Sequence, residues 1–386
     1  MSAFRCLLLV AHGLLLGAEP LRGQFAVADL QQVAAGPEIR QRPVVAVGAT
    51  GLRVFWAETR EVGQEGSVGQ RRIWGRQIDL HGQPEGEAEL AAGDWDDQGS
   101  PAAAVAADVT WLAHDFMHQD MRPGDSDLAL VPFVEFFGFR GTPVRLTRES
   151  PRGPTITRTA PALLYDSLFN RLILAHGTGV FRDGTGWRGG DYDSVNIEIR
   201  ELDRGGTVRH QFVVKGPDET GEAAMPSLTF LPEGWRERYL LAYVANGTRR
   251  ELGTAGSSVY LELFGDDWRV LGGRHMALPI GGASWPSVAA VGGKLYLAWV
   301  ENATSDIFIS ELDQELWPMR PMRLSTALDA SEFTERLGPV RPRLDAPVLF
   351  DHFGQLGIAF VLTREWLPER GRAWQEIWVG RMARTR

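Results

Sequence analysis

Three carboxylates in this sequence follow apolar runs at similar places, and carboxylates so placed are able to carry out acid–base chemistry. Glu58, Asp115 and Glu301 each end a run that is typical of a buried strand. If these strands converge on one axis, the side chains gather there, as glycoside hydrolysis requires. Acidic residues at strand ends also cap loops by accepting backbone N–H groups, which is the commoner role. The spacing fixes no distance between the carboxylates, so both interpretations stay open.

Two polar segments carry side chains that are suited to metal ions. Neither segment has a complete ligand set with diagnostic spacing, and an ordinary polar loop tip explains each of them. The second segment is rich in oxygen ligands and resembles part of a calcium loop. The sequence therefore predicts no required cofactor and leaves calcium as the candidate metal. The residues concerned are His114, Asp115, His118 and Asp120 in the first segment, and Asp191 and Asp193 in the second.

Tryptophan is abundant, with 13 residues, and several fall in segments that are predicted to be loops. An exposed indole offers a flat apolar plate and one hydrogen-bond donor, which suits a sugar ring. A loop tryptophan can also fold back and cover the end of the sheet to which its loop is attached. For any single residue this is the commoner outcome. The tryptophans that we predict to bind a ligand are Trp95, Trp187, Trp285, Trp366 and Trp374.

The elements that would position these side chains repeat along the chain. Prolines introduce apolar runs at intervals of about 60 residues, a period typical of repeat architectures. Each apolar run is followed by a short turn and a second apolar run. The repeating prolines are Pro43, Pro101, Pro161, Pro226, Pro286 and Pro347.

The fifth repeat shows four strands most clearly. Residues 287–291 and 295–300 are apolar and flank a Gly-Gly pair, which is a tight hairpin signal. Residues 306–312 alternate between polar and apolar, and residues 319–324 supply a fourth strand. Because the first strand is almost wholly apolar, it should be buried on both faces, with the later strands further out. A unit of four antiparallel strands is typical of a β-propeller blade, and six such units predict a six-bladed propeller.

The two ends of the chain complement each other. The sixth repeat stops after its third strand, while residues 25–33 form a strand without a repeat of its own. Pairing the two completes the last blade and removes both open sheet edges. The predicted fold class is all-β: a six-bladed β-propeller of four-stranded antiparallel blades over residues 23–386, the last blade closed by the N-terminal strand. The longer connections all lie on one face, so we expect the functional site there.

One repeat resembles a known family. Residues 286–301 read Pro-Ser-Val-Ala-Ala-Val-Gly-Gly-Lys-Leu-Tyr-Leu-Ala-Trp-Val-Glu, which is similar to the first two strands of repeats in the sialidase-like, Asp-box group of six-bladed propellers. Residues 305–310 are similar to that group's third strand. The resemblance is sharp in this repeat and periodic elsewhere. It implies the propeller fold.

The functional motifs of that family are present only in fragments. An Asp box reads Ser-x-Asp-x-Gly-x-x-Trp between the third and fourth strands, and residues 265–268 and 183–187 match it only in part. Sialidases also carry an early Arg-Ile-Pro segment that begins an arginine triad, and Arg42-Pro43-Val44 is a fragment of it. The fragment makes Arg42 a ligand-binding candidate. No Tyr–Glu nucleophile pair has an equivalent, so the resemblance implies the fold and transfers no catalytic site.

Residues 1–18 are typical of a signal peptide. Arg5 precedes an apolar run over residues 7–16, and Gly17-Ala18 offers small residues for cleavage. A buried or disordered N-terminal segment is the alternative. Cys6, the only cysteine, lies in this leader, so the mature chain would contain no disulfide and no thiol nucleophile. The sequence therefore predicts a secreted or periplasmic protein.

Composition limits the partners. The net charge is −9, and the chain lacks a basic cluster, which argues against nucleic-acid binding. No later segment is long and apolar enough for a membrane span. We expect an exported propeller that binds a ligand, with carbohydrate as the candidate class. The alternatives are a glycosidase or lyase that uses the carboxylates of the loop-rich face, and a scaffold that binds another protein.

Overall fold

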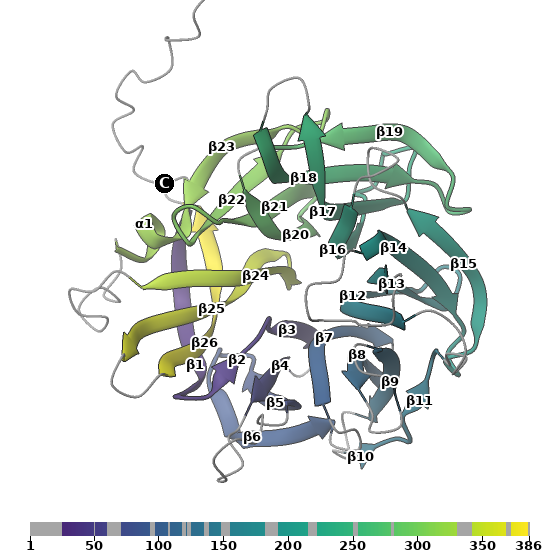
Figure 1. Cartoon of the computed structure of the whole chain (residues 1–386). Helices are drawn as coiled ribbons and strands as arrows, with labels where there is room; N and C mark the ends of the chain where they lie inside the picture. Colours follow the sequence, from purple (N-terminus) through teal and green to yellow (C-terminus); the bar gives the residue numbers. More distant parts are fainter. Residues whose placement is uncertain are drawn as a thin grey trace, which may run out of the picture.

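Six β-sheets surround one central axis in the part of the chain that the structure describes (Figure 1). Each sheet is one blade, and we number the blades 1 to 6 by the chain order of their inner strands. The computed structural model describes residues 25–49, 51–59, 71–92, 97–106, 109–117, 121, 125–134, 139–147, 155–181, 192–214, 222–249, 254–278, 282–329, 342–367 and 372–384. The predicted six-bladed β-propeller is confirmed.

Each blade runs outward from the axis through four antiparallel layers. The inner strands are β3 (Val44–Gly48), β7 (Asp97–Ala106), β12 (Thr155–Asp166), β16 (Glu222–Phe230), β20 (Ala283–Val291) and β24 (Arg343–His352). The second strands are β4 (Gly51–Thr59), β8 (Val109–Met117), β13 (Arg171–Phe181), β17 (Tyr239–Arg249), β21 (Lys294–Glu301) and β25 (Gln355–Leu367). The third strands are β5 (Arg71–Asp79), β9 (Asp127–Val134), β14 (Tyr192–Leu202), β18 (Thr254–Phe264), β22 (Asp306–Leu312) and β26 (Arg372–Arg384).

The outer layer is less regular. Its strands are β6 (Pro84–Ala92), β15 (Val208–Val214), β19 (Val270–Met276), β23 (Pro318–Arg323) and, in blade 2, the short pair β10 (Phe139–Arg140) and β11 (Val144–Arg145). The outer strand of blade 6 is β1 (Phe25–Gly36), which pairs antiparallel with β26. The N-terminal strand thus closes the ring as the sequence predicts. A two-residue strand, β2 (Ile39–Arg40), pairs with β4 ahead of β3, and the one helix among the described residues is α1 (Leu324–Asp329).

The repeating prolines mark a bulge at the start of each inner strand. In blade 5, Ser284 pairs with Val300 and Ser287 pairs with Ala298, so Trp285 and Pro286 together oppose one residue. A bulge of this kind bends the strand and re-aims side chains. The residue before the proline has a positive φ in four blades: Ala160 (48°), Met225 (53°), Trp285 (49°) and Ala346 (48°).

The turns between third and fourth strands repeat as well. Asp79 Oδ1 accepts the backbone N–H groups of His81 (2.8 Å) and Gln83 (2.7 Å), and Asp203 and Asp313 accept from the residues two and four positions later in the same way. An aspartate side chain that binds backbone two residues on is the usual Asx-turn. The aspartates in these turns therefore have a local structural role.

The core consists of clusters between neighbouring blades. Because successive residues of a strand face opposite sides, each blade contributes one set of side chains to each neighbour. Among the described residues, three glutamates each accept an indole N–H and are also ion-paired with an arginine, which satisfies polar groups that the packing buries. These sets are Trp56–Glu58–Arg40, Trp378–Glu376–Arg364 and Trp268–Glu201–Arg171.

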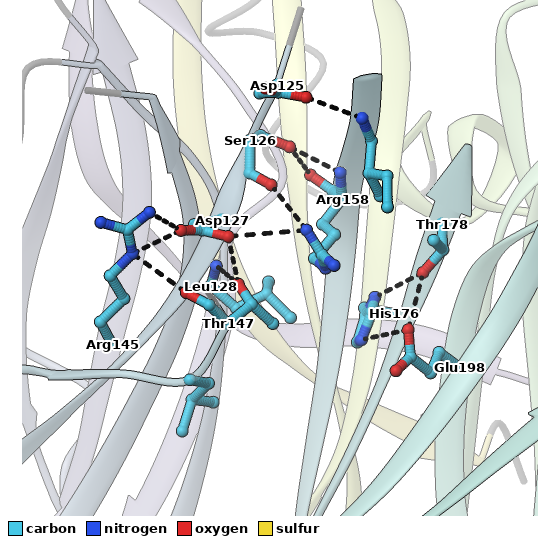
Figure 2. A network of polar contacts seen from close by, with 12 residues as sticks. Asp125, Ser126, Asp127, Leu128, Arg145, Thr147, Arg158, His176, Thr178 and Glu198 are labelled. Atoms are coloured by element: carbon cyan, nitrogen blue, oxygen red, sulfur yellow. Dashed lines mark hydrogen bonds and ion pairs between the residues drawn. The ribbon is translucent and has the colours of Figure 1, made fainter. Parts of the chain in front are cut away.

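Blades 2 and 3 are also joined by a polar network (Figure 2). Ser126 Oγ accepts the backbone N–H of Arg158 at 2.6 Å and donates to its carbonyl at 2.7 Å. The Arg158 guanidinium lies 3.5 Å from the buried Asp127 carboxylate, which Thr147 and Arg145 also contact. Nearby, His176 is fully buried, and desolvation lowers its pKa to about 3. These contacts hold polar side chains in a fixed arrangement between two blades.

No helix within the described ranges is long and apolar enough to cross a membrane. The predicted leader, residues 1–18, lies outside those ranges. The chain has a single cysteine, so it cannot form an internal disulfide. Its stability therefore depends on the packed blades and on the closing strand β1.

Candidate functional site

A cavity of about 390 Å³ lies where the inner strands begin, on the face that the sequence predicts to be functional. All six blades contribute to its wall through the one or two residues that precede the repeating prolines. These residues are Gln41, Arg42, Ser100, Thr159, Ala160, Ala224, Met225, Trp285, Asp345 and Ala346. Arg40, Arg71, Asp115, Val361 and Gln375 complete the wall. We call this the axial cavity.

Arg42 is the most informative residue of the axial cavity. Only 7% of its surface is exposed, and desolvation lowers its pKa to about 10, so it stays charged at neutral pH. Among the residues that the structure describes, no carboxylate or other acceptor pairs with its guanidinium. Burying a charge without a partner is costly, so a buried cation that lines a cavity is suited to receive an anion.

Trp285 forms an apolar part of the same wall. The Arg42 guanidinium lies 5.8 Å from the centre of the Trp285 ring, within the range of a cation–π contact. The ring is partly buried and packs against the clusters on both sides of blade 6. Trp285 therefore combines the two roles that the sequence leaves open, because it lines the cavity and also packs against the core.

Two carboxylates lie on the wall with these residues. Asp115 comes from β8, and its carboxylate lies against the backbone of Gly99, in space that the Cβ of any other residue at position 99 would occupy. Asp345 comes from β24, and desolvation raises its pKa. The axial cavity thus offers a buried guanidinium, an indole face and two carboxylates at one place.

Glu58, a predicted catalytic candidate, is not part of the axial cavity wall. Its side chain is 2% exposed, its Oε2 accepts the Trp56 Nε1–H at 3.0 Å, and it lies 3.0 Å from Arg40 Nε. Arg40 in turn donates to the Gln375 carbonyl at 2.8 Å. The structure thus places Glu58 in a network that links blade 1 to blade 6.

Glu301 also lies away from the axial cavity. Its carbonyl accepts the backbone N–H of Ser305 at 2.9 Å, and its carboxylate accepts the Thr304 hydroxyl at 2.7 Å. The Glu301 carboxylate thus binds within the loop, although to a hydroxyl and not to the backbone N–H groups that the capping alternative expects. Its position therefore offers structural support to the turn between β21 and β22.

Strand pairing corrects the expected equivalence of the three carboxylates. Glu58 and Glu301 each pair with the residue three positions before a repeating proline, Arg40 and Ala283. In blade 2 that partner is Gln98, and it pairs with Phe116 instead of Asp115. Phe116, and not Asp115, therefore occupies the position in blade 2 that Glu58 and Glu301 occupy in their blades. Because side chains alternate between the two faces of a strand, Asp115 points to the face opposite that of Glu58 and Glu301.

Only some of the metal-binding candidates belong to the described part of the chain. His114 is fully buried with its Nδ1 3.1 Å from the Asp115 carbonyl, while His118, Asp120 and Asp191 lie outside the described residues. Asp193 belongs to β14, but its side chain is outside the described part. Within the described ranges, no three or more His, Cys, Asp or Glu side chains form a metal-binding group. The calcium hypothesis stays a prediction.

Among the remaining tryptophan candidates, one has a described side chain and three do not. Trp95 and Trp187 lie outside the described residues, and Trp366 belongs to β25 with its side chain outside the described part. Trp374 is 40% exposed, and its Nε1 donates to Glu376 Oε1 at 3.1 Å. Of the ligand-binding candidates with described side chains, Trp285 and Arg42 line the axial cavity and Trp374 does not.

Sequence reasoning missed Asp345, Gln375 and Met225 as cavity residues. The signal for two of them was present, because Asp345 and Met225 stand two and one residues before a repeating proline. Each proline marks where an inner strand starts, so the residues before it face the axis from every blade. Gln375 precedes no such proline, and only the closure of blade 6 against blade 1 brings it to the cavity.

Solved structures of sialidases share this architecture. A Trypanosoma rangeli sialidase matches with a TM-score of 0.54 and 11% identity over 89% of this chain and 55% of that chain. The same protein in complex with sialic acid matches with a TM-score of 0.53 and 11% identity over 88% of this chain and 54% of that one. A subtype N11 neuraminidase-like protein of A/flat-faced bat/Peru matches with a TM-score of 0.52 and 8% identity over 91% and 90%.

The present chain thus corresponds to about half of the Trypanosoma rangeli protein. At these identities the likeness shows the fold alone. It confirms the sialidase-like propeller that the fifth repeat indicates. No family model matches the sequence, and no curated protein matches it.

Proposed function

We propose that this protein binds an acidic sugar in the axial cavity. The observation that carries the proposal is Arg42, a buried guanidinium on the cavity wall that contacts the Trp285 ring but has no carboxylate or other acceptor among the described residues. A carboxylate presents two oxygens in the geometry that a guanidinium fork matches, and the pair gains strength where water is excluded. The ligand's carboxylate would take the place of the missing partner.

Two further features favour a sugar over other acids. The Trp285 ring supplies a flat apolar surface beside Arg42, and a pyranose ring has an apolar face that fits such a plate. Ser100, Thr159 and Gln375 supply hydroxyl and amide groups that suit sugar hydroxyls. One protein of the same fold has been solved in complex with sialic acid, an acidic sugar, which is consistent with this ligand class.

Binding can be tested by calorimetry on the purified protein. The probes are glucuronic acid, galacturonic acid and N-acetylneuraminic acid, with glucose and galactose as neutral controls. We expect at least one acid to bind and both neutral sugars to bind far more weakly. The variant Arg42→Gln keeps a polar side chain but removes the charge, and it should abolish the preference for acids. Equal affinity for acidic and neutral sugars would contradict the proposal.

Hydrolysis is a second candidate, and Asp345 is the observation that favours it. A carboxyl group whose pKa is raised by desolvation can donate a proton to a leaving group, while a second carboxylate such as Asp115 acts as base or nucleophile. The test is turnover of 4-methylumbelliferyl glycosides of the same three acids. Asp345→Asn should remove turnover and retain binding. Binding without turnover in the unaltered protein would leave the binding function alone.

Export would bring the protein to glycans outside the cell, and the predicted leader over residues 1–18 supports it. Intact-mass measurement of protein from its natural host tests this proposal. The mature chain should begin shortly after Ala18. A cytoplasmic product that retains residues 1–18 would contradict it.

A further inference from the structure

We propose that Trp374 forms a second subsite, outside the axial cavity, which stacks on the second sugar ring of an acidic oligosaccharide. This inference rests on the proposed function, because the acidic end of the same molecule would occupy the axial cavity. It also extends that function, since it makes the ligand a glycan of at least two residues. The argument depends on how Trp374 is held and on where β26 carries it.

The Trp374 side chain is exposed but held in one orientation. Its ring is 40% exposed, and its Nε1 donates to Glu376 Oε1 at 3.1 Å. Glu376 is only 2% exposed and is fixed by Arg364, whose Nε lies 2.7 Å from the same oxygen. Because the indole nitrogen is satisfied by the protein, the part of Trp374 left to a ligand is the ring itself. A fixed ring stacks on a sugar with little further loss of side-chain entropy.

The core does not require this second indole. Trp378, two residues further along β26, donates its Nε1 to Glu376 Oε2 at 2.7 Å and is 4% exposed within the cluster between blades 5 and 6. Glu376 and Arg364 would therefore be paired and covered without Trp374. Trp374 thus stays 40% exposed while a buried carboxylate holds its nitrogen, and an exposed ring in a fixed orientation is able to stack on a sugar.

Trp374 adjoins the axial cavity through its neighbour Gln375. Gln375 lines the cavity, and its Oε1 accepts the backbone N–H of Arg40 at 2.5 Å. Since successive residues of a strand face opposite sides, Gln375 faces blade 1 and Trp374 faces blade 5. The two subsites thus lie on adjacent residues of one rigid strand. A glycan that leaves the cavity over blade 6 would meet the Trp374 ring.

Chain-length dependence of affinity tests this inference. The probe pairs are N-acetylneuraminic acid with sialyllactose, and glucuronic acid with cellobiouronic acid. In at least one pair, the longer sugar should bind the unaltered protein about tenfold more tightly, the gain expected from one aromatic stacking contact. Trp374→Ala should remove this gain and leave the affinity of the monosaccharide unchanged. Trp374→Phe should restore part of the gain, because it keeps an aromatic face.

Trp317 provides a matched control. It is 48% exposed and lies in the turn between β22 and β23, on the face opposite the axial cavity. Trp317→Ala should change neither affinity, and the melting temperature of Trp374→Ala should stay close to that of the unaltered protein. The subsite is overturned if the longer sugar has no advantage, if Trp374→Ala weakens both sugars equally, or if Trp317→Ala has the same effect. Failure of every acidic sugar to bind would instead overturn the proposed function itself.

Discussion

The Arg42 guanidinium lies 5.8 Å from the centre of the Trp285 ring, although the two residues belong to blade 1 and blade 5. Blade 6 stands between them, and at the equivalent position it carries only Ala346. Ala346 lines the same cavity wall as Arg42 and Trp285, and its small side chain is compatible with the contact between them. The ring faces the cation with its negative π surface, so Trp285 stabilises the orientation of Arg42 without neutralising its charge.

Arg42→Met should raise the free energy of unfolding while it abolishes binding of acidic sugars. Removing a buried charge that lacks a partner relieves a desolvation cost, and we expect a gain of about 1–3 kcal/mol. Urea unfolding measures the gain, and calorimetry measures the loss of binding. Arg40→Met is the matched control: it breaks an ion pair and leaves Glu58 buried, so it should destabilise by about 3–5 kcal/mol. Equal destabilisation by both variants would contradict the role of Arg42.

Trp285→Gly should be more stable than Trp285→Ala. Residue 285 has a φ of 49°, where a Cβ costs roughly 1 kcal/mol and glycine has no such cost. Both variants lose the ring contacts, so the difference between their melting temperatures reports the backbone strain less the larger unfolded-state entropy of glycine. Both should also weaken binding of acidic sugars, because each removes the surface that holds Arg42. A lower stability of the glycine variant would show that the strain at residue 285 is smaller than this entropy cost.

Glu58→Gln should destabilise the protein by about 2–3 kcal/mol, because it removes the buried carboxylate that pairs with Arg40 and leaves the more exposed Glu38 as the remaining ion-pair partner of Arg40. Glu301→Gln should change stability by less than about 0.5 kcal/mol, since its carboxylate contacts only a loop hydroxyl near the surface. Chemical denaturation of both variants provides the comparison. A Glu58→Gln variant with full stability but impaired turnover would restore Glu58 as a catalytic candidate.

His176 should make the fold less stable in mild acid. Its pKa is about 3 in the folded protein, against 6.5 for an ordinary histidine, so between these values only the unfolded chain takes up the proton. Stability should therefore fall with pH below 6.5, which amounts to about 2 kcal/mol between pH 7 and pH 5 from this residue. His176→Phe should remove that contribution from urea unfolding curves. His210→Phe, at an exposed site on β15, is the matched control for the substitution.

Deleting residues 25–36 should abolish cooperative unfolding and cause aggregation. The deletion removes β1, the outer strand of blade 6, and exposes the edge of β26 together with the buried side chains that Val27 and Val33 cover. Light scattering and thermal unfolding measure the outcome. A monomeric deletion variant with an unchanged melting temperature would contradict closure by β1.

The fold was predictable because its signals are local and repeated. A proline followed by an apolar run marks each inner strand in the sequence. Burial of the strand on both faces follows from the absence of polar alternation. Closure by residues 25–33 follows from counting strands at the two ends. The turns with Asp79, Asp203 and Asp313 carry the same kind of local signal, since each aspartate binds backbone within four residues.

The candidate site was only partly predictable. By itself, the sequence determined a propeller and its loop-rich face, because these depend on periodicity along the chain. Trp285 was a candidate from its place in a predicted loop, and Arg42 from the resemblance to the sialidase group. Only the tertiary structure decided that Arg42 of blade 1 contacts Trp285 of blade 5 and that Arg40 pairs with Glu58. It also decided that Asp115, offset by one residue, faces the axial cavity while Glu301 does not. The physical reason is that strand register and blade packing set these contacts, and both depend on residues far apart in the chain.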